Sequence, residues 1–116
     1  MTMYQTAAVF YVLWGLLHLF AAIQVFRSGA SLEPGMVQGR IYQSAWNLSY
    51  FAIFVTVVAI VYNWKGDPLG YWLNLVTTTV TDIGFIFFLL VPGYVPLRPG
   101  ILGPVLWILA VVFSTL

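Results

Sequence analysis

Two side chains combine ionisable chemistry with an apolar setting. His18 is the single histidine, and Asp82 follows the letters "TTTVT" inside a stretch that is otherwise uncharged. An imidazole and a carboxyl group that meet in a protein interior can give and take a proton as general acid and base. His18 and Asp82 are therefore the candidate acid/base residues.

The composition shows which elements must position these two side chains. The chain has 116 residues, of which 62% are hydrophobic and only 6% are charged. A soluble domain usually carries about a quarter charged residues, so the composition indicates a protein solvated by lipid. The net charge of +1 argues against nucleic acid as a partner. Without cysteine the chain forms neither disulfides nor thiolate metal sites.

Charged residues divide the sequence into four apolar stretches, at about 4–26, 41–63, 69–91 and 100–116. Each is long enough to cross a bilayer once, and a segment in lipid must be helical to satisfy its backbone. We therefore expect an all-α, integral membrane four-helix bundle with four transmembrane helices, forming one domain over residues 1–116. Asp67 and Pro68 are expected to cap the third helix and begin it. The polar segment 27–40 is expected to be the mobile or functional loop.

The few basic residues predict an orientation. Arg27, Arg40 and Arg98 fall on one side of the expected bundle, and Lys65 falls on the other side with both termini. Basic loops tend to stay in the cytoplasm. The pattern therefore predicts that both termini lie outside.

The expected depths bring the polar residues together. Helices one and three run in the same direction, so His18 and Asp82 lie about 4.5 Å and 3 Å beyond the middle of their spans, on the same side. Asn47 enters the same layer from helix two. Aromatic and polar stripes on the helices are expected to face the interior, while small residues such as Ala45 and Ala52 suit close helix packing. The candidate ligand-binding residues are Tyr11, Trp14, Gln43, Trp46, Asn47, Tyr50, Asn74, Thr78 and Trp107.

Three functions fit this pattern. The first is binding of a small hydrophobic or amphiphilic molecule in an intramembrane pocket, with acid/base chemistry by His18 and Asp82 as a further step. The second is a proton-linked transporter or channel subunit that works as a homo-oligomer. The third is an accessory subunit of a membrane complex. A purely structural hydrogen-bond network remains open beside them. One His and one Asp supply too few ligands for a metal site, and no cofactor is expected.

The overall plan is similar to small bacterial four-helix membrane proteins of the DoxX-like kind. The segments "GLLHLFAA" and "TDIGFIFFLLVPGYVPL" look like parts of bacterial membrane proteins. The resemblance covers length and number of spans. It implies a bacterial inner-membrane location and no particular activity, and no site residue follows from it.

Overall fold

The computed structural model describes all 116 residues and contains helices but no strand. Four helical stretches, Met3–Ala30, Met36–Lys65, Pro68–Leu90 and Leu97–Thr115, are long and apolar enough to cross a membrane. The prediction of an all-α chain with four such helices is confirmed. The elements are α1 (Met3–Ala30), α2 (Met36–Val61), the short 3₁₀ helix η1 (Asn63–Lys65), α3 (Pro68–Phe85), the π-helical turn η2 (Ile86–Leu90), α4 (Leu97–Gly100) and α5 (Leu102–Thr115).

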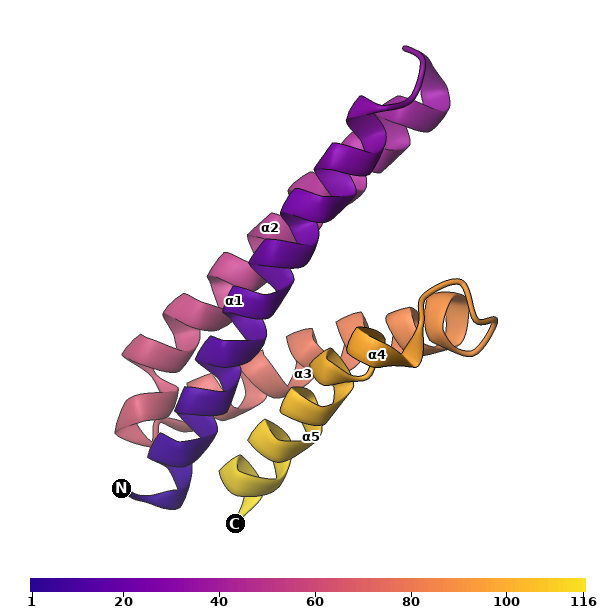
Figure 1. The fold of residues 1–116 in the computed structure, drawn as a ribbon. Coiled ribbons are helices and arrows are strands. Elements are labelled where there is room, and N and C mark those ends of the chain that lie inside the picture. The colour runs from indigo at the N-terminus through magenta and orange to yellow at the C-terminus, as the bar shows by residue number, and fades with distance from the viewer.

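Helices α1 and α2 form a long antiparallel hairpin in which the two backbones approach closely (Figure 1). A Cβ atom built on Gly15 would lie 2.8 Å from the carbonyl oxygen of Ala52, closer than any side chain tolerates. Small residues that recur every seven positions keep one face toward a partner helix and allow this approach. The buried small residues of the contact are Ala8, Gly15, Ala22 and Gly29 on α1 and Ala45, Ala52 and Ala59 on α2.

The connection between α1 and α2 is much shorter than predicted. Both helices continue into the polar segment 27–40, so only residues 31–35 lie between them. The amide of Gln38 donates to the carbonyl oxygens of Gly29 and Leu32, each at 3.0 Å, and ties the tip together. The prediction of a long loop here is wrong, because these backbone groups are satisfied by helix continuation and by Gln38.

The turn between α2 and α3 follows the prediction. Asp67 caps α3 by accepting a hydrogen bond from the Leu69 amide at 2.9 Å, and Pro68 occupies the first turn. Gly66 precedes the cap with a φ of 71°, a left-handed conformation that glycine adopts without strain. A Cβ atom on Gly66 would lie 3.3 Å from the ring of Tyr4. The turn therefore brings the start of α3 beside the start of α1.

Helix α3 places polar side chains inside and apolar side chains outside. Its buried residues are Gly70, Asn74, Thr78 and Asp82, spaced by four so that they form one face. Val76 and Val80 on the other side are 56% and 68% exposed. A surface helix of a water-soluble protein has the reverse arrangement.

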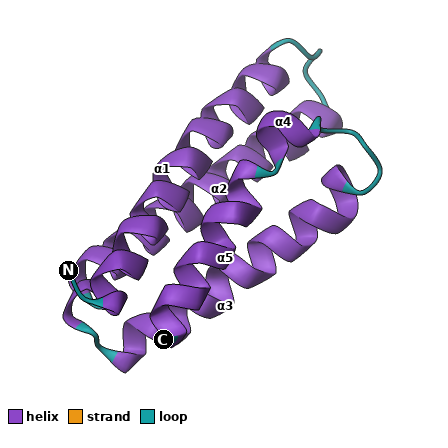
Figure 2. Cartoon of the chain, turned by 60° about the horizontal axis from the view of Figure 1, so that its bottom comes forward, coloured by secondary structure: helices purple, strands orange, loops and turns teal.

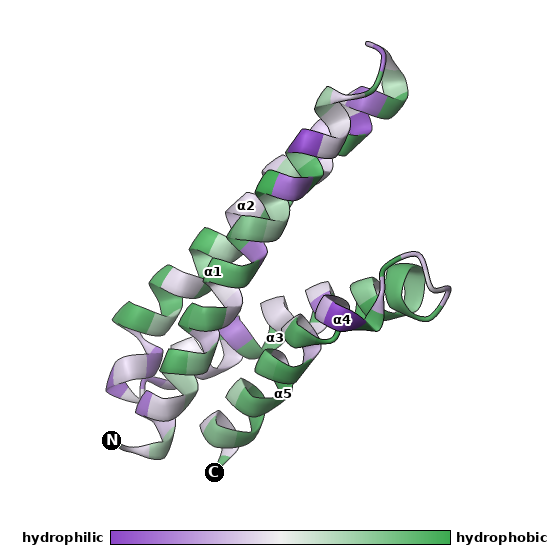
Figure 3. Ribbon diagram, in the orientation of Figure 1, coloured by the Kyte–Doolittle hydropathy of each residue, from purple (hydrophilic) through white to green (hydrophobic).

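The chain returns through α4 into α5, which packs against α1. The rings of Phe10 and Phe113 stack with centroids 5.6 Å apart, and Ala110 is buried in the same contact. The N- and C-termini lie at the same end of the molecule (Figures 1 and 2). Hydrophilic residues lie at the far tip of the α1–α2 hairpin, at α4 and at the end that carries the termini, and the helices between are largely hydrophobic (Figure 3). Together α1, α3 and α5 enclose the polar interior.

Candidate functional site

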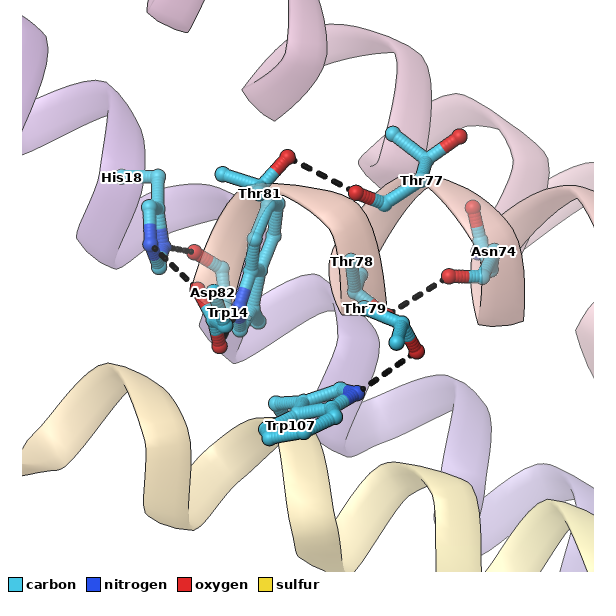
Figure 4. A network of polar contacts seen from close by, with 9 residues as sticks. All are labelled: Trp14, His18, Asn74, Thr77, Thr78, Thr79, Thr81, Asp82 and Trp107. Carbon is cyan, nitrogen blue, oxygen red and sulfur yellow. Dashed lines mark hydrogen bonds and ion pairs between the residues drawn. The ribbon is translucent and has the colours of Figure 1, made fainter. Parts of the chain in front are cut away.

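The centre of the candidate site is a contact between α1 and α3. Asp82 is fully buried, and its Oδ2 accepts a hydrogen bond from the Trp14 indole N–H at 3.0 Å. Its Oδ1 lies 3.4 Å from Nε2 of His18, whose side chain is 12% exposed. The indole and imidazole rings stack with centroids 3.8 Å apart. Both candidate acid/base residues are thus brought together, with Trp14 in direct contact with each (Figure 4).

The hydrogen bonds around His18 define where a proton must lie. Nδ1 of His18 is 2.8 Å from the carbonyl oxygen of Trp14. A carbonyl oxygen only accepts, so Nδ1 carries a hydrogen, and Nε2 is the nitrogen that faces Asp82. If neither Nε2 nor the carboxyl group held a proton, two lone pairs would face each other. The contact is therefore favourable when the His18–Asp82 pair shares one proton, as an ion pair or as a neutral pair.

A second polar cluster lies toward the end of the molecule that carries the termini. The amide nitrogen of Asn74 donates to the side-chain oxygen of Asn63 at 2.9 Å and to the carbonyl oxygen of Val55 at 3.1 Å. The hydroxyl of Thr78 donates to the Asn74 carbonyl oxygen at 2.7 Å. These contacts join α3 to α2 and η1. They lie one and two helical turns from Asp82 on the same face of α3.

The other predicted interior residues on α1 and α5 also face this region. Tyr11 is fully buried, with Thr78 of α3 and Ser114 of α5 as hydroxyl neighbours, although the Tyr11 oxygen has no well-formed hydrogen bond. Trp107 is half-buried, and its indole N–H donates to the hydroxyl of Thr79 at 3.0 Å. Tyr11 thus lies among the buried polar residues of the interior, whereas Trp107 joins α5 to α3 through its hydrogen bond to Thr79.

The prediction that the polar–aromatic stripe of α2 faces the interior is wrong. Trp46 and Tyr50 are 77% and 62% exposed, Asn47 is exposed, and Gln43 accepts a hydrogen bond from Arg40 at the surface. The physical reason is the small-residue face of α2. That face lies against α1, and the stripe is on the opposite side of the helix, so it points away from His18 and Asp82.

Outside the bundle interior, Trp46 of the exposed stripe lines a groove. The groove has a volume of about 410 Å³ and lies between α1 and α2. It begins at Ala22, one helical turn beyond His18. Its lining residues are Ala22, Ile23, Phe26, Tyr42, Ala45, Trp46 and Ser49.

Three contributors to the site were missed by the sequence analysis. Asn63 was assigned to the end of a span, and only its contact with Asn74 reveals its place in the interior. Gly103 packs on His18, since a Cβ atom there would lie 3.1 Å from Cε1 of the imidazole. Gly15 sets the distance between α1 and α2, and its seven-residue spacing from Ala8 and Ala22 was a readable signal.

No group of three or more histidine, cysteine or acidic residues comes together in the structure. Comparison with protein-family models, with curated proteins and with solved structures gave no match. The likeness to DoxX-like proteins therefore stays a prediction.

Proposed function

We propose that this chain is an integral membrane protein. Four apolar helices of sufficient length support this, and so does the arrangement of α3, which hides Asn74 and Asp82 and exposes valines. A surrounding hydrocarbon phase makes that arrangement favourable, because the exposed apolar side chains then contact lipid and the polar ones find partners inside. The arginine-rich side is assigned to the cytoplasm and both termini to the outside.

We propose that the chain acts as a proton-linked transporter or channel subunit, with the His18–Asp82 pair as the proton-binding site. The carrying observation is a carboxyl group that is 0% exposed and whose one ion-pair contact is an imidazole rather than a lysine or arginine. An ionisable group in mid-membrane costs about 2.5–3.5 kcal/mol to insert. A pair that gains or loses one proton changes its net charge, and this change can be coupled to movement of a substrate. Four helices are few for a transport path, so the working form is a homo-oligomer.

Proton flux in proteoliposomes tests this function. Vesicles containing a pH-sensitive dye receive a membrane potential, and acidification is compared for the wild type, Asp82→Asn and Glu33→Gln. Glu33 is exposed at the hairpin tip, so it provides a carboxylate-to-amide control outside the site. Flux in the wild type and in Glu33→Gln, with loss in Asp82→Asn, is the expected result. Equal flux in all three, or none above protein-free vesicles, would overturn the proposal.

The groove between α1 and α2 favours a second candidate function, binding of a small hydrophobic or amphiphilic molecule. Aromatic side chains of Phe26, Tyr42 and Trp46 line it, and it begins one turn from His18. An apolar tail would fit between these side chains.

Mass spectrometry of co-purified molecules tests this second function. Wild type and Trp46→Ala are purified in mild detergent, with Trp72→Ala as the control, since both tryptophans are largely exposed. A molecule retained by the wild type and Trp72→Ala but missing from Trp46→Ala supports binding in the groove. An identical set in all three proteins contradicts it.

A further inference from the structure

Three buried polar atoms of this structure lack a hydrogen bond. They are the Tyr11 hydroxyl, Oδ1 of Asn74 and Oδ1 of Asp82, the last of which has only the 3.4 Å ion-pair contact with Nε2 of His18. Buried polar atoms are almost always hydrogen-bonded, so each exception calls for a physical explanation. All three belong to the facing sides of α1 and α3, and thus to one region of the interior.

These atoms follow a continuous line of polar side chains. Asn74, Thr78 and Asp82 occupy successive turns of α3 and extend over about 12 Å. Tyr11 and His18 are two turns apart on α1, over about 10.5 Å. Because α1 and α3 start side by side and run in the same direction, Tyr11 lies near Thr78, as His18 lies near Asp82. We name Tyr11, Asn74, Thr78 and Asp82 the interior seam.

The interior seam leads to a pocket at the end of the bundle that carries the termini. The pocket has a volume of about 270 Å³, and its lining includes Asn63, Tyr71 and Ser114. Asn63 accepts the hydrogen bond from Asn74 at 2.9 Å, and Ser114 is a neighbour of the Tyr11 hydroxyl. Two residues of the pocket wall are thus in contact with members of the seam.

From this continuity we infer that the interior seam is a path by which water and protons reach the His18–Asp82 pair from the end that carries the termini. The inference rests on the proposed proton-linked function and adds the side from which the pair is reached. Tyr11 and Thr78 suit the path because a hydroxyl both accepts and donates. A proton taken from water in the pocket is accepted on a hydroxyl oxygen, which releases its own proton to the next acceptor. For Thr78 this step requires the hydroxyl to turn from the Asn74 carbonyl oxygen, to which it donates at 2.7 Å, toward Asp82. Asp82 or His18 receives the proton, and no oxidant or second reactant is required.

The single histidine provides a direct measurement of this path. With ¹⁵N-histidine as the only label, solid-state NMR in lipid bilayers reports the transfer of magnetisation from water to the ring of His18. The variants are Thr78→Val and, as the matched control, Thr77→Val. Both substitutions remove a hydroxyl at nearly constant shape, but Thr77 lies outside the seam. Tyr11→Phe provides a second variant within the seam, and the ¹⁵N shifts of His18 report whether each variant keeps the site intact.

We expect transfer to His18 to be about fivefold to tenfold slower in Thr78→Val and in Tyr11→Phe, the effect of losing about one hydrogen bond along the path. Thr77→Val should match the wild type. Equal transfer in all four proteins would overturn the path. The proton-flux assay separates this result from the proposed function. If the wild type conducts protons but magnetisation transfer to His18 is unaffected in Thr78→Val and Tyr11→Phe, the function is retained and the path is rejected. If transfer is slowed in these variants but the wild type shows no proton flux, the path is retained and the function is rejected.

Discussion

The closest approach between α1 and α2 provides a quantitative test of the fold, through the substitution Gly15→Ala. The added methyl group would lie 2.0 Å from the Thr56 hydroxyl oxygen and 2.8 Å from the carbonyl oxygen of Ala52. The Thr56 hydroxyl is held by its own hydrogen bond to Ala52 O at 2.8 Å, and the carbonyl belongs to the helix backbone. Neither atom can move without breaking a contact. Overpacking of this kind costs about 1–3 kcal/mol, and we expect Gly15→Ala to lower the free energy of unfolding by about that amount.

A rescue variant distinguishes the two clashes. In Gly15→Ala/Thr56→Ala the hydroxyl at 2.0 Å is gone, but the Ala52 carbonyl oxygen at 2.8 Å remains. The double variant should therefore recover part of the lost stability, on the order of 1 kcal/mol. Full recovery would mean that the approach of the Ala52 carbonyl oxygen costs no stability, and this outcome would contradict the backbone clash.

Reversible unfolding in mixed detergent micelles, followed by tryptophan fluorescence, measures these changes. Gly84→Ala is the control, because a Cβ atom there meets nothing within 4 Å. It should raise the free energy of unfolding by about 0.5–1 kcal/mol, because alanine loses less backbone entropy than glycine inside a helix. If Gly15→Ala were as stable as Gly84→Ala, the close packing of α1 on α2 described above would be refuted.

Three further predictions concern the interior. The ¹⁵N spectrum of wild-type His18 should show a protonated Nδ1, because that nitrogen donates to a carbonyl oxygen, and an unprotonated Nδ1 would contradict this hydrogen bond. Asp82→Asn should change the Nε2 shift far more than the Nδ1 shift, because Nε2 is the nitrogen that faces Asp82. Gly103→Ala should perturb both His18 shifts, because the new methyl group would lie 3.1 Å from Cε1, and unchanged shifts would refute this packing. A double-mutant cycle of Trp107→Phe and Thr79→Val should give a coupling of about 1 kcal/mol in unfolding, from the 3.0 Å hydrogen bond; additive effects would exclude that bond.

The interior contacts also separate a structural role of Asp82 from a chemical one. Asp82→Asn keeps an oxygen that can accept from the Trp14 indole, so its stability should fall by less than about 1 kcal/mol. Asp82→Leu leaves that indole N–H buried without an acceptor, which costs about 1–3 kcal/mol. The same unfolding assay measures both, and equal losses in the two variants would refute the role of the Trp14 hydrogen bond.

The sequence by itself determined the number of long helices and the positions of His18 and Asp82 along the helix axes. Charges interrupt the apolar stretches at only a few places, and backbone groups in such stretches are satisfied by helices. Asp67 and Pro68 mark the start of α3 by local chemistry that needs no distant contact. Helical rise alone placed His18 and Asp82 at similar depths on two helices that run in the same direction.

Only the tertiary structure decided which face of each helix lies inside. Periodicity shows that Trp46 and Tyr50 share a face, but in a chain whose exterior is apolar an aromatic face suits the outside as well as the inside. In α2 the inward face is the one with small residues such as Ala52, because two helix backbones approach closely and gain most dispersion contact where the side chains are small. The hydrogen bond from Trp14 to Asp82 likewise depends on how α1 is rotated about its own axis, which its packing against α2 determines.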